Sequence, residues 1–277
     1  MAKLRLVLGR RSNAPSAQLG HKDAADLFTS TTIAPSTEIS PLERMDPEVP
    51  EVYFAVGESA LRAIRMAQVA AGVEDFSSIL DFPSGHGRVL RWLQAAYPKA
   101  RLSACDLLTD GVDFCVETFG AEAIYSTEIP SPDLFSRRYD LIWVGSLLTH
   151  VDVDRWDLLI RLWNDLLEPN GLLVVTTHGP QVAASMRRGF LYGYPEPGIE
   201  RLLRSYESFG FGFLEDNPAT CTYGITVCTP SWAIDRLLSH GDFNLVLASE
   251  AMWSKHQDVI AVVKGTRSLP WANADAR

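Results

Sequence analysis

Apolar positions change their period several times along the chain. Segments with apolar side chains three or four positions apart predict helices at residues 59–71 and 110–119 and after Asp152. Between the helices stand short, continuous apolar runs, which predict buried strands. These runs are residues 79–82, 101–105, 121–125, 141–144 and 172–176. Regular alternation of strands and helices is typical of an α/β fold with a central parallel sheet.

The first predicted strand runs directly into a glycine-containing turn. Asp81 ends the strand, residues 83–87 interrupt the pattern, and apolar residues recur at helical spacing from Val89. A strand, a glycine turn and a helix together form the unit that binds nucleotide-like ligands at the carboxyl end of a parallel sheet. The glycines let backbone N–H groups approach the ligand, and the N-terminus of the helix favours an anionic group.

A second acid and a missing glycine narrow the class of nucleotide. Asp106 ends the second predicted strand, where an acid can accept hydrogen bonds from two ribose hydroxyls. The dinucleotide fingerprint has a third glycine three residues after the second, and this position holds Leu90. The turn therefore disfavours a nicotinamide dinucleotide.

The turn, Asp-Phe-Pro-Ser-Gly-His-Gly-Arg, resembles the first motif of class I S-adenosylmethionine (SAM)-dependent methyltransferases, and Asp106 matches that family's ribose-binding acid. The sequence departs from the family at Pro83, where a glycine is usual, because proline has no N–H to donate. The resemblance implies SAM as the cofactor. It implies that the cofactor-binding residues are Asp81, Phe82, Pro83, Ser84, Gly85, His86, Gly87, Arg88, Asp106, Leu107, Ser126, Thr127, Gly145, Ser146 and Tyr53. For Tyr53, a packed aromatic side chain is the alternative.

The end of the chain adds to the resemblance. Residues 243–252 and 258–263 are predicted strands that stand too close together for a parallel crossover, so we expect them to pair antiparallel. The family has a Rossmann-like, seven-stranded and mostly parallel sheet in the order 3-2-1-4-5-7-6, with the last strand antiparallel and helices on both faces. We therefore expect this α/β fold. Dehydrogenases lack the terminal hairpin.

The chain divides into three predicted parts. Residues 1–45 are rich in Ser, Thr and Ala without a sustained period, which predicts a flexible N-terminal arm. Residues 46–179 and 230–266 form the predicted SAM-binding core. Residues 180–229 interrupt the alternation and hold eight of the twenty Phe and Tyr residues. This segment predicts an inserted cap that forms much of the acceptor pocket, and the alternative is a satellite cluster that only thickens the core.

Composition excludes several classes of partner. The formal charge of −9 and the pI of about 5.2 argue against a nucleic-acid partner, which usually needs a basic face. No stretch approaches the ~20 apolar residues of a membrane span, so no membrane partner is expected. The four cysteines show neither C-x-x-C spacing nor a Cys/His metal pattern, which predicts reduced thiols, a cytoplasmic location and no metal. The oligomeric state stays open.

Methyl transfer to a hydroxyl needs a base that takes the proton, and histidine suits this role at neutral pH. His178 ends the fifth predicted strand and is the first candidate, and His150 follows the fourth strand and is the second. A structural role is the alternative for both.

The class of acceptor follows from what the sequence lacks. It has no Asn/Asp-Pro-Pro-Tyr segment for nitrogen methylation and no Pro-Cys nucleophile for cytosine methylation. The His-Gln-Asp-Val sequence at residues 256–259 resembles the end of methyltransferases associated with glycan and small-metabolite tailoring. The prediction is a SAM-dependent methyltransferase for O-methylation of a small molecule or glycan. The alternatives are a nicotinamide-dependent oxidoreductase and a SAM-binding protein without catalytic activity.

Overall fold

The computed structural model describes residues 33–45, 48–216 and 223–265. All of them belong to one compact unit, residues 31–277. Residues 1–32 of the predicted arm lie outside the described residues.

The described residues form a sheet of seven strands. In spatial order the strands are β3 (Glu122–Tyr125), β2 (Arg101–Asp106), β1 (Ser78–Asp81), β4 (Tyr139–Val144), β5 (Leu167–Thr177), β9 (Gln257–Lys264) and β8 (Phe243–Trp253). The first five are parallel, and β9 is antiparallel to both of its neighbours. When β8 and β9 count as the sixth and seventh strands, this order confirms the predicted 3-2-1-4-5-7-6 topology.

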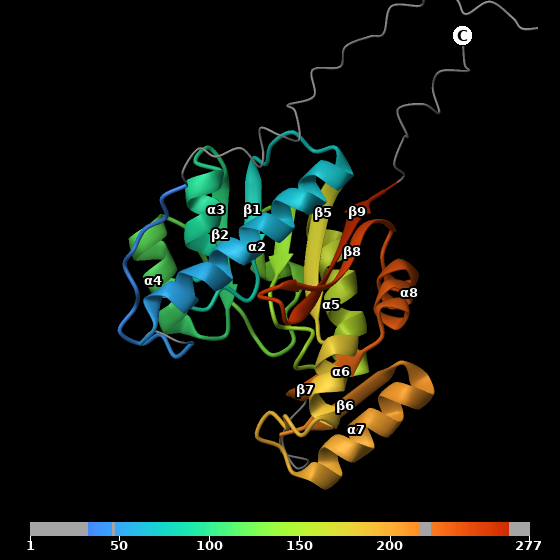
Figure 1. Cartoon of the computed structure of the whole chain (residues 1–277). Helices are drawn as coiled ribbons and strands as arrows, with labels where there is room; N and C mark the ends of the chain where they lie inside the picture. The colour runs from blue at the N-terminus through green and yellow to red at the C-terminus, as the bar shows by residue number, and fades with distance from the viewer. Residues whose placement is uncertain (1–32, 46–47, 217–222, 266–277) are drawn as a thin grey trace, which may run out of the picture. The chain divides into compact units, whose positions relative to one another are not determined.

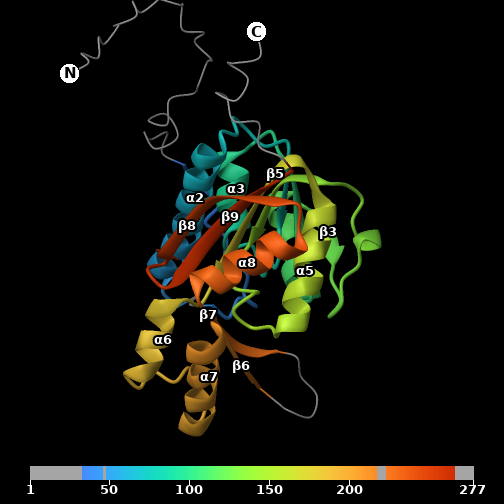
Figure 2. The same ribbon diagram turned by 90° about the vertical axis from the view of Figure 1, so that its right-hand side faces the viewer.

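Helices cover both faces of the sheet (Figures 1 and 2). On one face lie α2 (Pro50–Ala71), α3 (Leu90–Ala96) and α4 (Thr109–Phe119), and on the other lie α5 (Val153–Leu166) and α8 (Pro230–His240). Neighbouring residues on one strand pack into the apolar clusters on opposite faces of the sheet, as Ile79 and Leu80 on β1 do. The strands are therefore buried on both sides, which explains their continuous apolar runs.

Helix α2 begins nine residues before the predicted start at residue 59, so that boundary was wrong. The prolines and acids of this stretch resemble a linker. Pro50 is nevertheless compatible with a helix start, because the first helical residue needs no N–H donor. Gly72 ends the helix in a left-handed conformation with φ of 68°, so the predicted helix end at residue 71 is confirmed. Tyr53 therefore lies on α2.

The predicted insertion contains α6 (Pro180–Arg187), α7 (Glu196–Phe209) and the antiparallel hairpin of β6 (Phe211–Glu215) and β7 (Gly224–Cys228). These elements pack around an apolar cluster of their own, which includes Val182, Met186, Ile199, Leu202 and Val227. Strand β7 joins the core through backbone hydrogen bonds from Gly224 to His150 and from Thr226 to Thr149, each 2.8 Å long. The insertion continues directly from the carboxyl end of β5 (Figure 1).

Two further findings concern membrane-spanning helices and the state of the cysteines. None of the helices in the described part of the chain combines the length and apolar character needed to cross a bilayer. Cys105, Cys115 and Cys228 are buried free thiols, and Cys221 lies outside the described residues.

Candidate functional site

A cavity of about 520 Å³ opens at the carboxyl ends of β1, β2, β3 and β4. This is the edge where parallel α/β sheets bind ligands. Thirteen of the predicted cofactor residues line it: Asp81, Phe82, Pro83, Ser84, Gly85, His86, Arg88, Asp106, Leu107, Ser126, Thr127, Gly145 and Ser146. The other two, Gly87 and Tyr53, do not line it, and Tyr53 is fully buried.

The glycine turn requires its two glycines for different reasons. Gly85 and Gly87 both have left-handed backbones, with φ of 49° and 74°. At Gly87 a Cβ would lie 2.3 Å from the Phe119 ring, so the residue packs against α4. At Gly85 a Cβ would meet no atom within 4 Å. Gly85 therefore leaves room for a ligand in the cavity.

Asp106 binds the glycine turn itself. Its Oδ2 accepts a 2.7 Å hydrogen bond from the Gly85 N–H, and its Oδ1 accepts a 2.9 Å bond from the Leu108 N–H. A carboxylate has about four acceptor positions, so these bonds leave capacity for ribose hydroxyls. The acid thus holds the turn in the shape that the ligand would meet.

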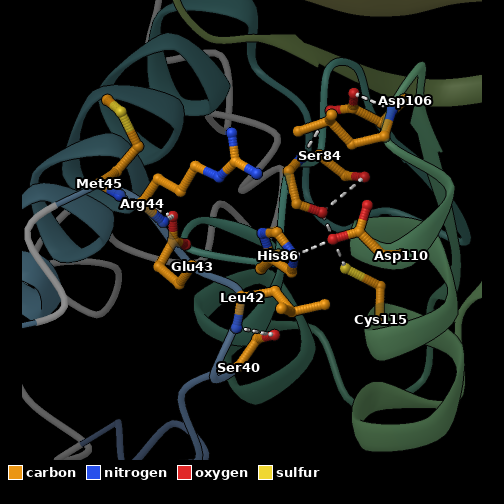
Figure 3. Close-up of polar contacts among 12 residues, drawn as sticks. Ser40, Leu42, Glu43, Arg44, Met45, Ser84, His86, Asp106, Asp110 and Cys115 are labelled. Atoms are coloured by element: carbon orange, nitrogen blue, oxygen red, sulfur yellow. Dashed lines mark hydrogen bonds and ion pairs between the residues drawn. The ribbon is translucent and has the colours of Figure 1, made fainter.

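His86 fixes the other side of the turn. Its side chain is buried, and Nε2 lies 3.0 Å from Asp110 Oδ2 on the first turn of α4 (Figure 3). This hydrogen bond is the main reason that the pKa of Asp110 is lowered. His86 therefore anchors the turn, and the segment that carries Glu43 and Met45 lies across the same cavity.

Asp81 is the most unusual group in the cavity. Its side chain is buried, and neither carboxylate oxygen has a hydrogen-bond partner among the described residues. Burial, and then the neighbouring Asp106, raise the pKa of Asp81 well above its usual range, and the nearby Leu90 N–H opposes the shift without the geometry of a full hydrogen bond. A buried carboxylate is costly without a partner, so this position favours a ligand with a cationic or donor group.

Arg91 connects the 33–45 segment to the glycine turn. Its side chain is fully buried, and the guanidinium donates to the carbonyls of Ser36 (2.9 Å), Glu38 (2.6 Å) and Gly87 (3.1 Å). It also donates to the Tyr53 hydroxyl over 3.1 Å. Residues 36–38, which the sequence analysis places in the arm, therefore contact the core next to the turn.

A ring of hydrogen bonds fixes Ser146 beside the cavity. Its φ of 60° is rare for a residue with a side chain. The Ser146 N–H donates to Thr176 Oγ1 over 2.8 Å, and that hydroxyl donates to Gln257 Oε1 over 2.6 Å. Gln257 Nε2 closes the ring by donating to Ser146 Oγ over 2.9 Å.

The two candidate bases have different surroundings. His150 lines the cavity, its ring stacks on Tyr223 with centroids 4.8 Å apart, and burial lowers its pKa. His178 does not line the cavity and is only 4% exposed. Burial, followed by the nearby His256 and His150, lowers the pKa of His178 to about 3. Both rings place Nδ1 against β7, on the carbonyls of Gly224 (2.7 Å) and Thr226 (3.1 Å).

Several lining residues were not predicted from the sequence. They come from elements far apart along the chain: Glu43, Met45, Leu108, Glu128, Trp143, Leu147, Arg155 and Trp253. Leu108 and Glu128 directly follow predicted contacts, so a wider window at each strand end would have included them. Glu43 and Trp253 carry no comparable signal, because only the packing of distant segments brings them to the cavity.

The insertion contributes one described residue, Tyr223, to the cavity lining. Its proposed role as a substrate cap stays a prediction. No group of three or more His, Cys, Asp or Glu side chains in the described segments is arranged to hold a metal ion.

No protein-family model matches the sequence, and comparison with curated proteins found no match. Among solved structures, the chain is similar to an S-adenosylmethionine-dependent methyltransferase from Clostridium acetobutylicum ATCC 824. The identity is 13% and the TM-score 0.51, over 77% of this chain and 92% of that one. It is also similar to a structure from Nostoc punctiforme PCC 73102 that is proposed to be an O-methyltransferase. There the identity is 18% and the TM-score 0.51, over 87% of this chain and 66% of that one.

At such low identity the similarity establishes the fold alone. The strand order, the antiparallel terminal hairpin and the ligand-binding edge all agree with it. The chain has the Rossmann-like fold of class I SAM-dependent methyltransferases.

Proposed function

We propose that this protein is a SAM-dependent methyltransferase that methylates an oxygen atom of a small molecule or glycan. The observation that carries the proposal is the buried carboxylate of Asp81, a residue that lines the cavity and whose two oxygens have no hydrogen-bond partner among the described residues. A cationic cofactor suits this position, because a positive charge stabilises an ionised buried acid. SAM carries both a sulfonium and an ammonium group.

The other residues of the cavity fit the same cofactor. Asp106 retains acceptor capacity for ribose hydroxyls, and Gly85 leaves open space above the turn. Ser126 and Thr127 follow β3 and line the cavity, where the family resemblance implies contact with the adenine. When bound, SAM supplies an electrophilic methyl group.

The chain's own residues would position the acceptor and remove its proton. We assign the base role to His150 rather than to His178, because His150 lines the cavity, whereas His178 is buried and does not line it. The His150 Nδ1–H donates to the Gly224 carbonyl, so Nε2 keeps a lone pair that can take a hydroxyl proton. His178 stays an alternative.

The nicotinamide alternative conflicts with both sequence and topology. Leu90 stands where the dinucleotide fingerprint has its third glycine, and the order of the sheet differs from the 3-2-1-4-5-6 order of dinucleotide-binding folds. The remaining alternative, a SAM-binding protein without catalytic activity, would bind SAM but show no turnover.

Calorimetry with SAM, S-adenosylhomocysteine (SAH) and NAD tests the proposal. We expect SAM and SAH to bind and NAD not to bind. Asp81→Asn should weaken SAM binding about ten- to a hundredfold, because it removes a charged acceptor. Asp113→Asn, an exposed acid outside the cavity, is the control. NAD binding without SAM binding would refute the proposal.

A further inference from the structure

Ser146 and His150 stand four residues apart on the segment that follows β4, and both line the cavity. Each is a group that can in principle donate or accept a hydrogen bond. The contacts that they make with the rest of the chain remove this ambiguity. They determine which kind of ligand atom these two side chains can contact.

The direction of the hydrogen bond from Ser146 follows from its neighbours. Thr149 Oγ1 lies 2.7 Å from the Ser146 carbonyl, which can only accept, so the Thr149 hydroxyl hydrogen points there. The Ser146 hydroxyl therefore donates to Thr149 Oγ1, 3.2 Å away. Gln257 Nε2 donates to one lone pair of Ser146 Oγ. The lone pair that remains is what Ser146 can offer to the cavity.

His150 is constrained in the same way. Its Nδ1 lies 2.7 Å from the Gly224 carbonyl, so the ring hydrogen is on Nδ1. Burial lowers the pKa of His150, which keeps the ring neutral and leaves a lone pair on Nε2. Both polar side chains of this segment therefore accept hydrogen bonds from a ligand and do not donate them.

The rest of the cavity indicates the body of the ligand. On the side of Ser146 and His150, away from the predicted cofactor residues, the cavity is lined by the apolar side chains of Leu147, Val151, Leu158 and Tyr223. The stacked rings of His150 and Tyr223 lie within 9° of parallel and add a flat wall. Of the lining cations, Arg88 donates to the Tyr53 carbonyl and Arg155 pairs with Glu128 at 3.1 Å. Apolar surface of this kind favours an apolar ligand.

We propose that the methyl acceptor is an uncharged molecule with an apolar, aromatic body, whose hydroxyl donates a hydrogen bond to Ser146 Oγ or His150 Nε2. This inference rests on the proposed function. It selects an aromatic alcohol or phenol among the possible acceptors. It disfavours carboxylates and phosphates, whose oxygens would face the lone pairs of Ser146 and His150.

Three matched probes test the inference on the SAH-saturated protein at pH 7. They are 2-naphthol, which donates a hydrogen bond, 2-methoxynaphthalene, which does not, and 2-naphthoate, which is anionic. We expect 2-naphthol to bind about three- to tenfold more tightly than 2-methoxynaphthalene, as one hydrogen bond predicts. We expect 2-naphthoate to bind at least about tenfold more weakly than 2-naphthol. Methyl glucoside serves as the sugar probe and should bind more weakly than 2-naphthol.

Two serine-to-glycine variants test whether Ser146 is responsible for the preference for 2-naphthol over its methyl ether. Ser146→Gly removes the hydroxyl and suits the φ of 60°. If Ser146 accepts the hydrogen bond, the substitution should reduce the preference for 2-naphthol over its methyl ether by about threefold or more, whereas an unchanged preference would assign the bond to His150. Ser254→Gly is the control, since Ser254 has a φ of 53° and does not line the cavity. It should leave the preference unchanged.

Binding measurements on the wild-type protein alone can overturn the inference. Equal affinity for 2-naphthol and its methyl ether, tighter binding of 2-naphthoate or of methyl glucoside, or no binding of any naphthalene would each contradict it. Binding of SAH is measured first and separately. Failure of SAH to bind contradicts the proposed function, whereas normal SAH binding with the wrong probe order contradicts only this inference.

Discussion

The two sides of the cavity are built in different ways. On the β1–β2 side, the contacts of the glycine turn with β2 and α4 join residues close in sequence, as in the 21-residue separation of Gly85 and Asp106 and the 24-residue separation of His86 and Asp110. On the β4–β9 side, Ser146 and Gln257 are 111 residues apart, and His150 and Gly224 are 74 apart.

This difference separates a proposed cofactor side, which is recognisable in the sequence, from a proposed acceptor side that has no local signature. A strand, a glycine turn and an acid at the next strand end lie within about thirty residues, so a short sequence window contains the whole unit. The β4–β9 side depends on the antiparallel pairing of β9 with β5 and on the insertion, and each supplies one partner of a polar contact. Substitutions on each side should therefore affect different measurements.

The largest expected effect is that of Gly85→Val on the cofactor side. The added side chain fills the space that the cavity leaves at Gly85, and a β-branched residue disfavours its φ of 49°. We expect the SAH affinity, measured by calorimetry, to fall by about a hundredfold or more. Gly120→Val is the control, because its φ is 67°, its Cβ would also meet no atom within 4 Å, and it does not line the cavity. Retained SAH affinity in Gly85→Val would show that the turn does not contact the cofactor.

Asp106→Asn should have the next largest effect. It removes the charge and replaces one acceptor oxygen with a donor, which opposes the N–H of Gly85 or Leu108. We expect SAH affinity to fall about ten- to a hundredfold. Thermal melting should show a folded protein. An unchanged dissociation constant would mean that the ribose is held elsewhere.

On the β4–β9 side, His178→Asn tests whether burial keeps His178 neutral. The measurement is the pH dependence of the unfolding free energy. The pKa of His178 is about 3 in the folded protein and about 6.5 when unfolded, so between these values the unfolded state binds more protons. The resulting stabilisation is complete above about pH 6.5 and is lost as the pH falls toward 3. From pH 7 to pH 5, the wild type should lose about 2 kcal/mol more than His178→Asn in urea unfolding.

The comparison of the wild type with His178→Asn has an internal control. His150 and His256, which face His178, remain in both proteins and contribute to both slopes. The asparagine amide can also still donate to the Thr226 carbonyl. Parallel pH profiles of the two proteins would show that His178 is not held neutral by burial.

Gln257→Met should have the smallest effect, and this effect should be limited to the β4–β9 side. The substitution keeps the side-chain length but opens the hydrogen-bond ring of Ser146 and Thr176, which should cost about 1 kcal/mol of unfolding free energy. SAH affinity should stay within about twofold. Gln181→Met, which removes one exposed bond to the Lys255 carbonyl, should cost less. A large loss of SAH affinity in Gln257→Met would show that the two sides of the cavity are coupled.

Most of the fold follows from the sequence because its information is local. Continuous apolar runs predicted strands buried on both faces, and the short link between β8 and β9 predicted antiparallel pairing. The start of α2 was missed, because a proline at the first helical position resembles a linker residue. Asp81, Gly85 and Asp106 were placed at one sheet edge because parallel strands align their carboxyl ends.

Only the tertiary structure decided how the polar groups of the site are used. Along the chain, His178 and His150 hold similar positions after neighbouring strands, but packing buries His178 and leaves His150 in the cavity. Which nitrogen of His150 carries the hydrogen depends on a carbonyl 74 residues away, and the hydroxyl direction of Ser146 depends on Thr149 and Gln257. Hydrogen-bond direction is a property of the assembled partners, so no pattern in the sequence contains it.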